Sequence, residues 1–552
     1  MISPDGGRSG PAEAVAWRAL LATGILVGAL LRWYQLSIQV VLDDEWHALH
    51  KVLYSDSVGI ATSFGYADHS IPLALYYRFL LLHGGLTEWV MHLPMLLSGI
   101  ALLVVAPLLL RRETTLPVRA TWVALLAISP LLVYHSKVAR PYALTSLLVP
   151  LAIIAFRRWC LADRAARAWS ATYVVATFLA GWLHTITLAF TLLPFGYYGV
   201  RCLLHARNGE RLAGAAAGLG KLLRLGLITA IPLAAALLPP LINDWGSLSA
   251  KAGVDEVTLE STYRTLLMLF GVSQLLLLIA LAALTVLGIH RMWRRDSDLT
   301  SYLGTIIVGA AVAIAAARPV WIHHAALYSR YLLPVLPFLL LFLAEGTIAA
   351  IDQLRAAALL RAIAVAAMVT ALWWLGPIPS YFYYPNQFMG HLRFQFDYDP
   401  ARNPYVQLVP LDPVPDFYRT LAQRPAASLT LIEAPWRLES NFNPHPWYQE
   451  IHRQKVKIGL TTPACGVRTF GEYPATVAGL RLHQFAHLSS ILAGKTYDAD
   501  YLVVHLGPWK TPPDATVEWP DVAACLPKIE AALGTPVYRD GQIVVFALKN
   551  KP

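Results

Sequence analysis

The sequence predicts an all-α polytopic membrane domain followed by a small α/β domain. The 552-residue chain is 56% hydrophobic and only 14% charged, and its mean hydropathy is +0.50. This composition is typical of an integral membrane protein. Apolar runs near or above the roughly 20 residues that span a bilayer as a helix recur from Trp17 to Trp374 and then stop. We therefore expect a transmembrane domain over residues 1–377 and a non-membrane domain over residues 378–552.

The length criterion gives about eleven membrane helices. Ile71 to His83 is apolar but too short to cross, and counting it as a span would place most basic loops outside. We therefore expect it to lie as a helix in the outer interface. The expected spans run near residues 16–36, 89–110, 119–136, 140–158, 168–186, 187–204, 221–241, 266–289, 300–317, 328–349 and 359–376.

The distribution of Lys and Arg indicates the orientation. With the amino terminus inside, the inner loops hold about twice as many Lys and Arg residues as the outer loops, as the positive-inside rule requires. The net charge of +10 is therefore interpreted as a topology signal, and no nucleic acid is expected as a partner. An odd number of spans then places the first long loop, residues 37–88, and the C-terminal domain on the outer side.

Cysteine usage excludes a disulfide-dense scaffold, because the chain has only 4 cysteines, and none has the spacing of a metal site. Cys465 and Cys525 lie in the C-terminal domain and could pair if that domain is outside the cytoplasm. Their pairing is left open because the sequence does not give their separation.

Three consecutive carboxyl groups follow the first apolar stretch. They are Asp43, Asp44 and Glu45, with Trp46 and His47 beside them. Their position at the exit of a membrane helix favours chemistry held at the membrane surface. The alternative is that the acids have no function and only mark a loop in which polar residues are tolerated.

Two outer arginines stand where the positive-inside rule disfavours them. Arg140 and Arg330 each have aromatic and His neighbours at headgroup depth. A guanidinium group binds phosphate well because its planar fork donates two parallel hydrogen bonds and keeps its charge. Outer acids together with outer arginines therefore indicate a lipid phosphate substrate and a base. The alternative is that the arginines extend to the interface among its tyrosines.

Three segments resemble the glycosyltransferase C superfamily, especially family 39 and its bacterial relatives, which include protein O-mannosyltransferases and lipid A aminoarabinose transferases. They are Asp44-Glu45-Trp46-His47, the segment HSKVARPYAL (residues 135–144) and the segment SRYLLPVLP (residues 329–337). The chain departs from the pattern at Lys137-Val138, where acidic residues are common, and at HSIPL (residues 69–73), which replaces His-Pro-Pro-Leu.

The resemblance implies a multi-pass glycosyltransferase of the bacterial inner (plasma) membrane, with a polyprenyl-phosphate-linked sugar as donor and inversion at the sugar carbon. The acceptor is a lipid, glycan or protein presented outside. Asp44 is our candidate for the base that accepts the acceptor's proton, because close like charges raise the pKa of a carboxylate. Glu45 orients Asp44 or binds the sugar, and Asp43 is the substitute for Asp44.

Further residues are predicted to bind substrate. His47 and His69 position the phosphate or the acceptor, and the two arginines stabilise the charge of the leaving phosphate. No cofactor and no metal ligand is assigned, although neighbouring Asp and His leave a divalent metal open. His184 is expected to satisfy a backbone carbonyl. The substrate-binding set is His47, His69, Arg140, Tyr142, Arg330 and Tyr331.

The C-terminal domain is expected to alternate strands and helices. Asp540-Gly541 between the last two strand-like runs is a hairpin signal. The domain has no phosphate loop or nucleophile motif, so it serves acceptor recognition or covers the outer cavity. Expected strands are 428–433, 456–460, 501–506, 537–539 and 543–548, and expected helices are 414–424, 445–453 and 519–533.

Two other functions stay open. The first is a transporter or flippase of lipid-linked glycans, although transporters place charges near the midplane in broken helices, whereas here they gather at one face. The second is a non-catalytic scaffold that anchors the C-terminal domain.

Overall fold

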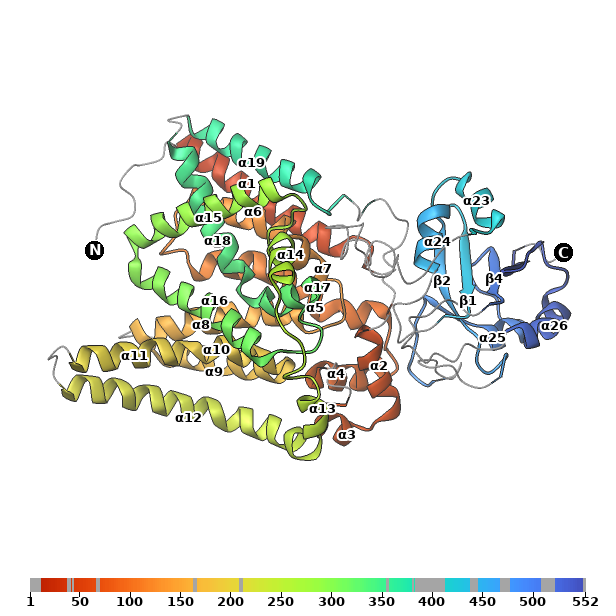
Figure 1. Cartoon of the computed structure of the whole chain (residues 1–552), viewed down its shortest axis with the longest axis horizontal. Coiled ribbons are helices and arrows are strands. Elements are labelled where there is room, and N and C mark those ends of the chain that lie inside the picture. The colour runs from red at the N-terminus through yellow and green to blue at the C-terminus, as the bar shows by residue number, and fades with distance from the viewer. Residues whose placement is uncertain are drawn as a thin grey trace. The chain divides into compact units, whose positions relative to one another are not determined.

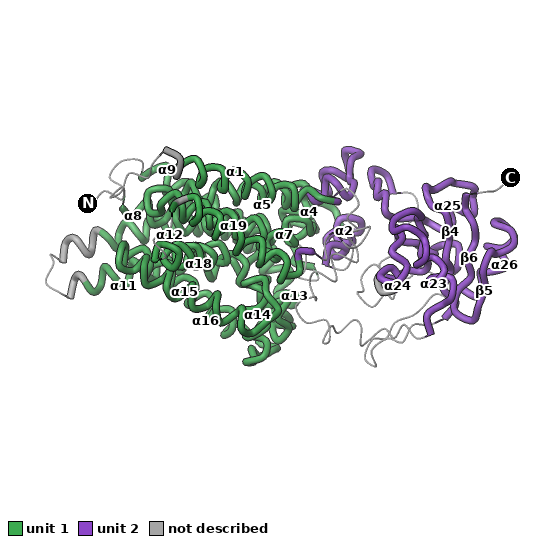
Figure 2. The backbone as a smooth tube through the Cα atoms, turned by 90° about the horizontal axis from the view of Figure 1, so that it is seen from above, with its two compact units in different colours: residues 1–34, 55–75, 93–377 green, residues 35–54, 76–92, 378–552 purple. Residues whose placement is uncertain are grey.

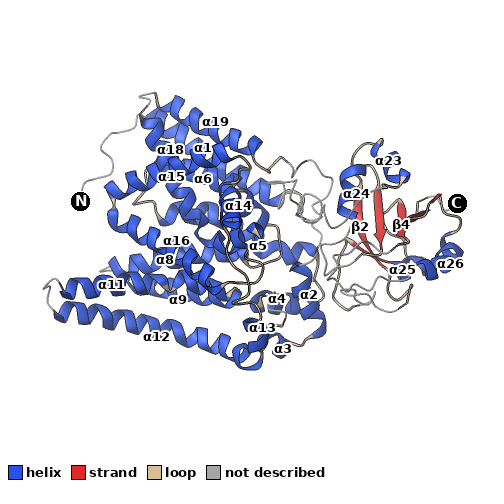
Figure 3. Cartoon of the chain, viewed as in Figure 1, coloured by secondary structure: helices blue, strands red, loops and turns tan. Residues whose placement is uncertain are grey.

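A computed structural model describes residues 11–36, 41, 44–65, 70–161, 166–207, 212–353, 357–379, 382, 413–436, 445–466, 477–507 and 522–549. Helices dominate it, and a six-stranded β-sheet lies in the C-terminal third (Figure 1 and Figure 3). Figure 2 shows two compact units. Unit 1 holds residues 1–34, 55–75 and 93–377, and unit 2 holds residues 35–54, 76–92 and 378–552. Parts of the first expected outer loop therefore belong to the same unit as the C-terminal domain.

The helices before residue 378 follow one another along the chain, with 3-10 turns at Thr185–Thr187 and Leu333–Val335. Their bounds are α1 (Pro11–Trp33), α2 (Asp44–Tyr54), α3 (Ser57–Ala61), α4 (Ile71–Leu82), α5 (Glu88–Leu109), α6 (Leu116–Ile128), α7 (Pro130–His135), α8 (Tyr142–Leu161), α9 (Ala166–Leu183), α10 (Leu188–Thr191), α11 (Leu193–Arg207), α12 (Leu212–Asn243), α13 (Trp245–Ser249), α14 (Leu259–Phe270), α15 (Leu275–Arg295), α16 (Ser297–Ala317), α17 (Ala325–Leu332), α18 (Leu336–Asp352) and α19 (Ala358–Leu375).

The all-α polytopic membrane domain is confirmed. Among the described residues, 8 helical segments are long and apolar enough to cross a membrane. They are Ala14–Trp33, Glu88–Leu109, Tyr142–Leu161, Thr185–Leu204, Gly218–Asn243, Leu275–Arg295, Ser297–Ala317 and Ala325–Asp352. The other expected spans correspond to α6, α9 and α19, which are helical but fall short of that test of length and composition. The expected interfacial segment forms α4, an apolar helix of 12 residues.

The expected span 119–136 is broken at Pro130, where α6 gives way to α7. Pro130 has no backbone N–H, so the carbonyl of Leu126, four residues earlier, loses its helical donor. The fully buried Arg32 replaces that donor. Its Nη2 donates to the Leu126 carbonyl at 3.0 Å and its Nη1 to the Ala127 carbonyl at 3.2 Å. Arg32 therefore joins α1 to α6 and has a structural role.

Helices α15 and α18 pack at very short range because glycines line their contact. A Cβ atom on Gly346 would lie 1.7 Å from the carbonyl oxygen of Leu284, and one on Gly288 would lie 1.8 Å from that of Phe342. At one end of this contact, the fully buried Glu345 forms an ion pair with Arg295. Small residues at a helix contact let two backbones approach closely, as is common in membrane proteins.

The C-terminal sheet has the strand order β3-β2-β1-β4-β6-β5. The first four strands in this order are parallel, and β6 is antiparallel to both of its neighbours. The strands are β1 (Thr430–Ala434), β2 (Lys455–Leu460), β3 (Phe485–His487), β4 (Tyr501–His505), β5 (Tyr538–Arg539) and β6 (Ile543–Ala547), and the helices are α23 (Asp416–Ala422), α24 (His445–His452), α25 (Leu488–Leu492) and α26 (Val522–Leu533).

Helices cover both faces of this sheet. On one face, α23 and α24 contribute Tyr418 and Tyr448 to the core. On the other face, α25 and α26 contribute Ile491 and Ile529. The predicted α/β domain is therefore confirmed as three layers. The hairpin expected at Asp540-Gly541 joins β5 to β6, whereas β3 and α25 were not predicted.

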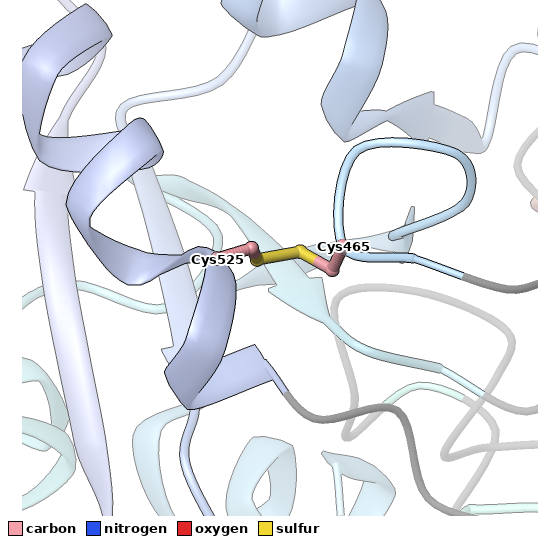
Figure 4. Close-up of a disulfide and its surroundings, with 2 residues drawn as sticks. All are labelled: Cys465 and Cys525. Atoms are coloured by element: carbon pink, nitrogen blue, oxygen red, sulfur yellow. A yellow bond between two sulfur atoms is a disulfide. The ribbon is translucent and has the colours of Figure 1, made fainter.

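Cys465 and Cys525 form a disulfide, with their Cα atoms 5.0 Å apart (Figure 4). Cys465 lies in the turn after β2, and Cys525 lies in α26. Both cysteines pack with the core on the α25 and α26 face of the sheet. The pairing that the sequence left open is therefore made, and it links two segments of the C-terminal domain.

Candidate functional site

Helix α2 carries Asp44 and Glu45 and places them on different sides, one less buried than the other. It begins at Asp44, which is half-buried, whereas Glu45 is 2% exposed. His47 is also half-buried, and it lies three residues after Asp44. Residues three apart share one face of a helix, so Asp44 and His47 lie on the less buried side. A carboxylate in the first turn is also favoured by the helix dipole, which suits a group that must be ionised to act as a base.

Glu45 is held by a histidine that the sequence analysis missed. The Nε2 atom of His92, in α5, lies 2.8 Å from Oε1 of Glu45, and both side chains are buried. The Nδ1 atom of His92 contacts the backbone carbonyl of Glu88. A carbonyl only accepts hydrogen bonds, so Nδ1 carries a hydrogen. Glu45 and the Nε2 atom of His92 therefore share one proton, and this contact fixes the inward side of α2.

The same unit connects α2 and α5 to the C-terminal domain. The ring of Trp46 packs against that of Phe485, with 6.3 Å between centroids. The backbone N–H of Gln484 donates to Glu88 at 2.7 Å. Phe485, the first residue of β3, therefore contacts the helix that carries Asp44, and Gln484 contacts α5.

Arg140 and Arg330 approach the same aromatic ring in unit 1. The Cζ atom of Arg330 lies 5.1 Å from the centroid of Tyr142, and that of Arg140 lies 6.0 Å from it. Tyr331 adds a second ring at 6.0 Å from the Arg330 Cζ atom. We call Arg140, Tyr142, Arg330 and Tyr331 the arginine cluster. Two guanidinium groups are therefore gathered at one ring, and guanidinium is the group best suited to bind phosphate.

Histidines extend the arginine cluster. The ring centroid of His135 is 4.9 Å from that of Tyr142, and His184 is 5.6 Å from Tyr142 and 6.1 Å from Tyr331. From the sequence, His184 is expected to contact only a backbone carbonyl, and His135 has no separate signal. The position of His184 at the outer end of an expected span was the available signal for its place beside these tyrosines.

Lys137 lies between the two helices that flank Arg140. It is 1% exposed, and its Nζ atom donates to the backbone carbonyl of Tyr34, at the end of α1. The neighbouring Ser136 accepts a hydrogen bond from Arg32 at 3.2 Å. The lysine that departs from the family pattern thus anchors this segment to α1.

Other parts of the expected site stay predictions. His69 and Asp43 lie outside the described residues. The roles expected for them, and a metal site that includes them, therefore stay predictions. The acids of α2 belong to unit 2 and the arginine cluster to unit 1. A common pocket for Asp44 and Arg330 is therefore a prediction as well.

Among the solved structures that resemble this chain are two of ArnT and one of AftD. ArnT from Cupriavidus metallidurans in complex with undecaprenyl phosphate is 14% identical, with a TM-score of 0.44 over 97% of this chain and 98% of that one. The apo form of the same protein is 15% identical, with a TM-score of 0.45 over the same shares of the two chains. The arabinofuranosyltransferase AftD from mycobacteria is 16% identical, with a TM-score of 0.42 over 96% of this chain and 40% of that one.

These proteins are of the superfamily that the sequence motifs resemble. At these identities and TM-scores, the likeness assigns no residue role and no activity to this chain. No protein-family model matches the sequence, and no curated protein matches it.

Proposed function

We propose that the protein is a membrane glycosyltransferase that moves a sugar from a polyprenyl-phosphate donor to an acceptor hydroxyl at the outer face of the bacterial inner membrane. The arginine cluster carries this proposal. Two guanidinium groups beside one ring, in a chain whose described residues include eight apolar segments long enough to cross a membrane, suit a phosphate that is attached to a lipid.

The reaction assigns a role to each group. The acceptor oxygen attacks the anomeric carbon from the side opposite the phosphate, and the bond between that carbon and the phosphate oxygen breaks, so the sugar carbon is inverted. Asp44 takes the proton of the acceptor hydroxyl. Arg140 and Arg330 stabilise the negative charge that the leaving phosphate gains. Glu45, bound to His92, holds α2 in place and does not react.

The disulfide supports the proposed orientation. Disulfides persist in oxidising compartments and are rare in the cytosol, and Cys465 and Cys525 both lie in the C-terminal domain. An oxidising environment for that domain agrees with the distribution of Lys and Arg, which also places it outside the cytoplasm.

The decisive experiment combines glycan analysis with donor binding. We expect mass spectrometry of cell-envelope glycans to reveal a sugar that is missing in cells without the gene, and its mass identifies both sugar and acceptor. Asp44→Asn should fail to restore that sugar while still binding polyprenyl phosphate in native mass spectrometry. Glu256→Gln changes a carboxylate that is 76% exposed and serves as the control that should restore it.

Arg330→Lys tests the donor site. It keeps the charge but loses the planar fork, so we expect binding of polyprenyl phosphate to weaken by about tenfold or more. Arg318→Gln is the control, because Arg318 is also an expected outer arginine but pairs with Glu256. Normal transfer by Asp44→Asn would contradict the proposal. Impaired lipid flux with no glycan product missing would instead indicate a transporter.

A further inference from the structure

A buried polar cluster in the C-terminal domain lies apart from the proposed reaction. Glu433, His445 and His505 are all completely buried. Each offers a potential ligand atom, and these atoms lie within 4.8 Å of one another. Among the described residues, this is the group of His, Cys, Asp and Glu side chains that meets this condition. Two imidazoles and one carboxylate form a donor set that suits divalent first-row transition metals.

The sheet topology brings these residues together. Glu433 in β1 is the register partner of Val503 in β4, and His505 lies two residues further along β4. Side chains two residues apart in a strand share a face, so Glu433 and His505 point to the same side. His445 is the first residue of α24, which covers that side.

The position is also one at which α/β sheets bind ligands. Helix α24 connects β1 to β2 and lies on one face of the sheet, whereas α25 connects β3 to β4 and lies on the other. The order of the strands therefore reverses between β1 and β4. Ligands of open α/β sheets bind at such a switch point, at the carboxyl ends of the strands. Glu433 is next to last in β1, and His505 is last in β4.

The hydrogen bonds of the cluster fit metal ligation. The Nε2 atom of His445 lies 2.9 Å from the carbonyl oxygen of Pro435, so Nε2 carries the hydrogen and Nδ1 carries the lone pair. The Tyr418 hydroxyl donates to Oε2 of Glu433 at 2.9 Å. The other carboxylate oxygen of Glu433, Oε1, is buried and has no hydrogen-bond partner within the described part of the chain.

Burial adds to the case for a cation. All three side chains are completely buried, and a buried carboxylate without a full countercharge is unfavourable, so a divalent cation would supply that charge.

We propose that Glu433, His445 and His505 bind one divalent transition-metal ion of the Zn²⁺ type, which stabilises the C-terminal domain. Three protein ligands leave the fourth position of a tetrahedral zinc ion to a further ligand such as water, and Trp436 packs on His445 with 4.4 Å between ring centroids. The Nε2 atom of His505 and Oε2 of Glu433 are 2.6 Å apart. Ligand atoms around a tetrahedral zinc ion stand about 3.3 Å apart, so on binding this pair opens slightly, the hydrogen bond between the two atoms is lost, and His505 carries its hydrogen on Nδ1.

Metal binding by the full-length protein in detergent tests the proposal directly. After tag removal and chelator treatment, the protein should bind one equivalent of Zn²⁺ or Co²⁺, and Co²⁺ should develop the visible absorption of a tetrahedral site with nitrogen and oxygen ligands. Binding should also raise the unfolding temperature. Absence of stoichiometric binding by the folded wild-type protein would overturn the proposal and leave the cluster as a hydrogen-bond network only.

Variants then locate the site. His445→Gln and His505→Gln should each abolish the cobalt spectrum, and Tyr418→Phe should weaken metal affinity by about 10- to 100-fold through loss of a supporting hydrogen bond. His452→Gln is the control, because His452 is equally buried in α24. It should keep the spectrum. An unchanged spectrum in both ligand variants would also refute the assignment, and near-ultraviolet circular dichroism identifies any variant that has simply unfolded.

Discussion

His92 and Glu45 form a buried pair, with the Nε2 atom of the histidine 2.8 Å from Oε1 of the glutamate and neither side chain more than 2% exposed. These two residues are 47 positions apart in the sequence. Their contact fixes the position of α2, the helix that begins with the proposed base, Asp44. Removing one partner of a buried pair is strongly destabilising, because the other charge stays buried, whereas replacing both with apolar groups is often tolerated.

We therefore predict that His92→Phe lowers the stability of the protein by about 3–5 kcal/mol. Glu45→Met combined with His92→Phe should recover much of that loss, because no buried carboxylate remains. Thermal unfolding in detergent measures both variants. A double variant as unstable as the single one would show that the pair is not the source of the effect.

Two substitutions of Tyr142 distinguish the role of its aromatic ring in the arginine cluster from the role of its hydroxyl group. Tyr142→Phe keeps the aromatic face near both guanidinium groups, so binding of polyprenyl phosphate should stay near the wild-type value. Tyr142→Leu removes the cation–π contacts, each worth about 0.5–2 kcal/mol, and should weaken binding by about tenfold. Native mass spectrometry with the lipid measures both, and equal binding by the two variants would argue against a role for the ring.

Gly346 tests the close contact of α15 and α18. Any Cβ atom there meets the Leu284 carbonyl, so Gly346→Ala must push the helices apart and should reduce stability by about 1–3 kcal/mol, the usual loss on overpacking. Gly304→Ala, in α16, is the matched control because a Cβ atom on Gly304 would meet no other atom within 4 Å. We expect it to be neutral or stabilising, as a better helix former. Thermal unfolding compares them.

The disulfide should stabilise the C-terminal domain. It closes a loop between residues 60 positions apart, and chain entropy alone assigns such a loop about 4 kcal/mol. Cys465→Ser with Cys525→Ser, or treatment with reductant, should therefore increase proteolysis of residues 413–549 while leaving the membrane helices intact. Cys160→Ser, which removes an exposed free cysteine, should have no such effect.

Local patterns were sufficient to predict most elements. The strand-like runs at β1, β2, β4 and β6 are short, rich in Val, Ile and Leu and bounded by turn residues, a pattern consistent with buried strands. The helices of the membrane domain follow from apolar length. The sequence analysis missed β3 because it has only three residues, Phe485–His487, which is too short for a periodic signal.

The errors arise where a partner distant in sequence decides the structure. Pro130 was available as a signal for a helix break, but hydropathy outweighed it, and the donor that makes the break stable comes from Arg32. His92 looked like part of an apolar span, since nothing near it in the sequence reveals Glu45. The residues of the arginine cluster are candidates from the sequence alone, whereas their grouping around Tyr142 required coordinates.

The packing of Trp46 against Phe485 also bears on how the chain is made. Helix α2 leaves the ribosome early, whereas the residues that complete its surroundings are among the last to be translated. During most of synthesis, the segment with Asp44 is therefore without this aromatic neighbour. A premature stop codon near residue 378 would therefore keep the described helices before that residue, and α2 would retain its contact with His92 but lose the one with Phe485.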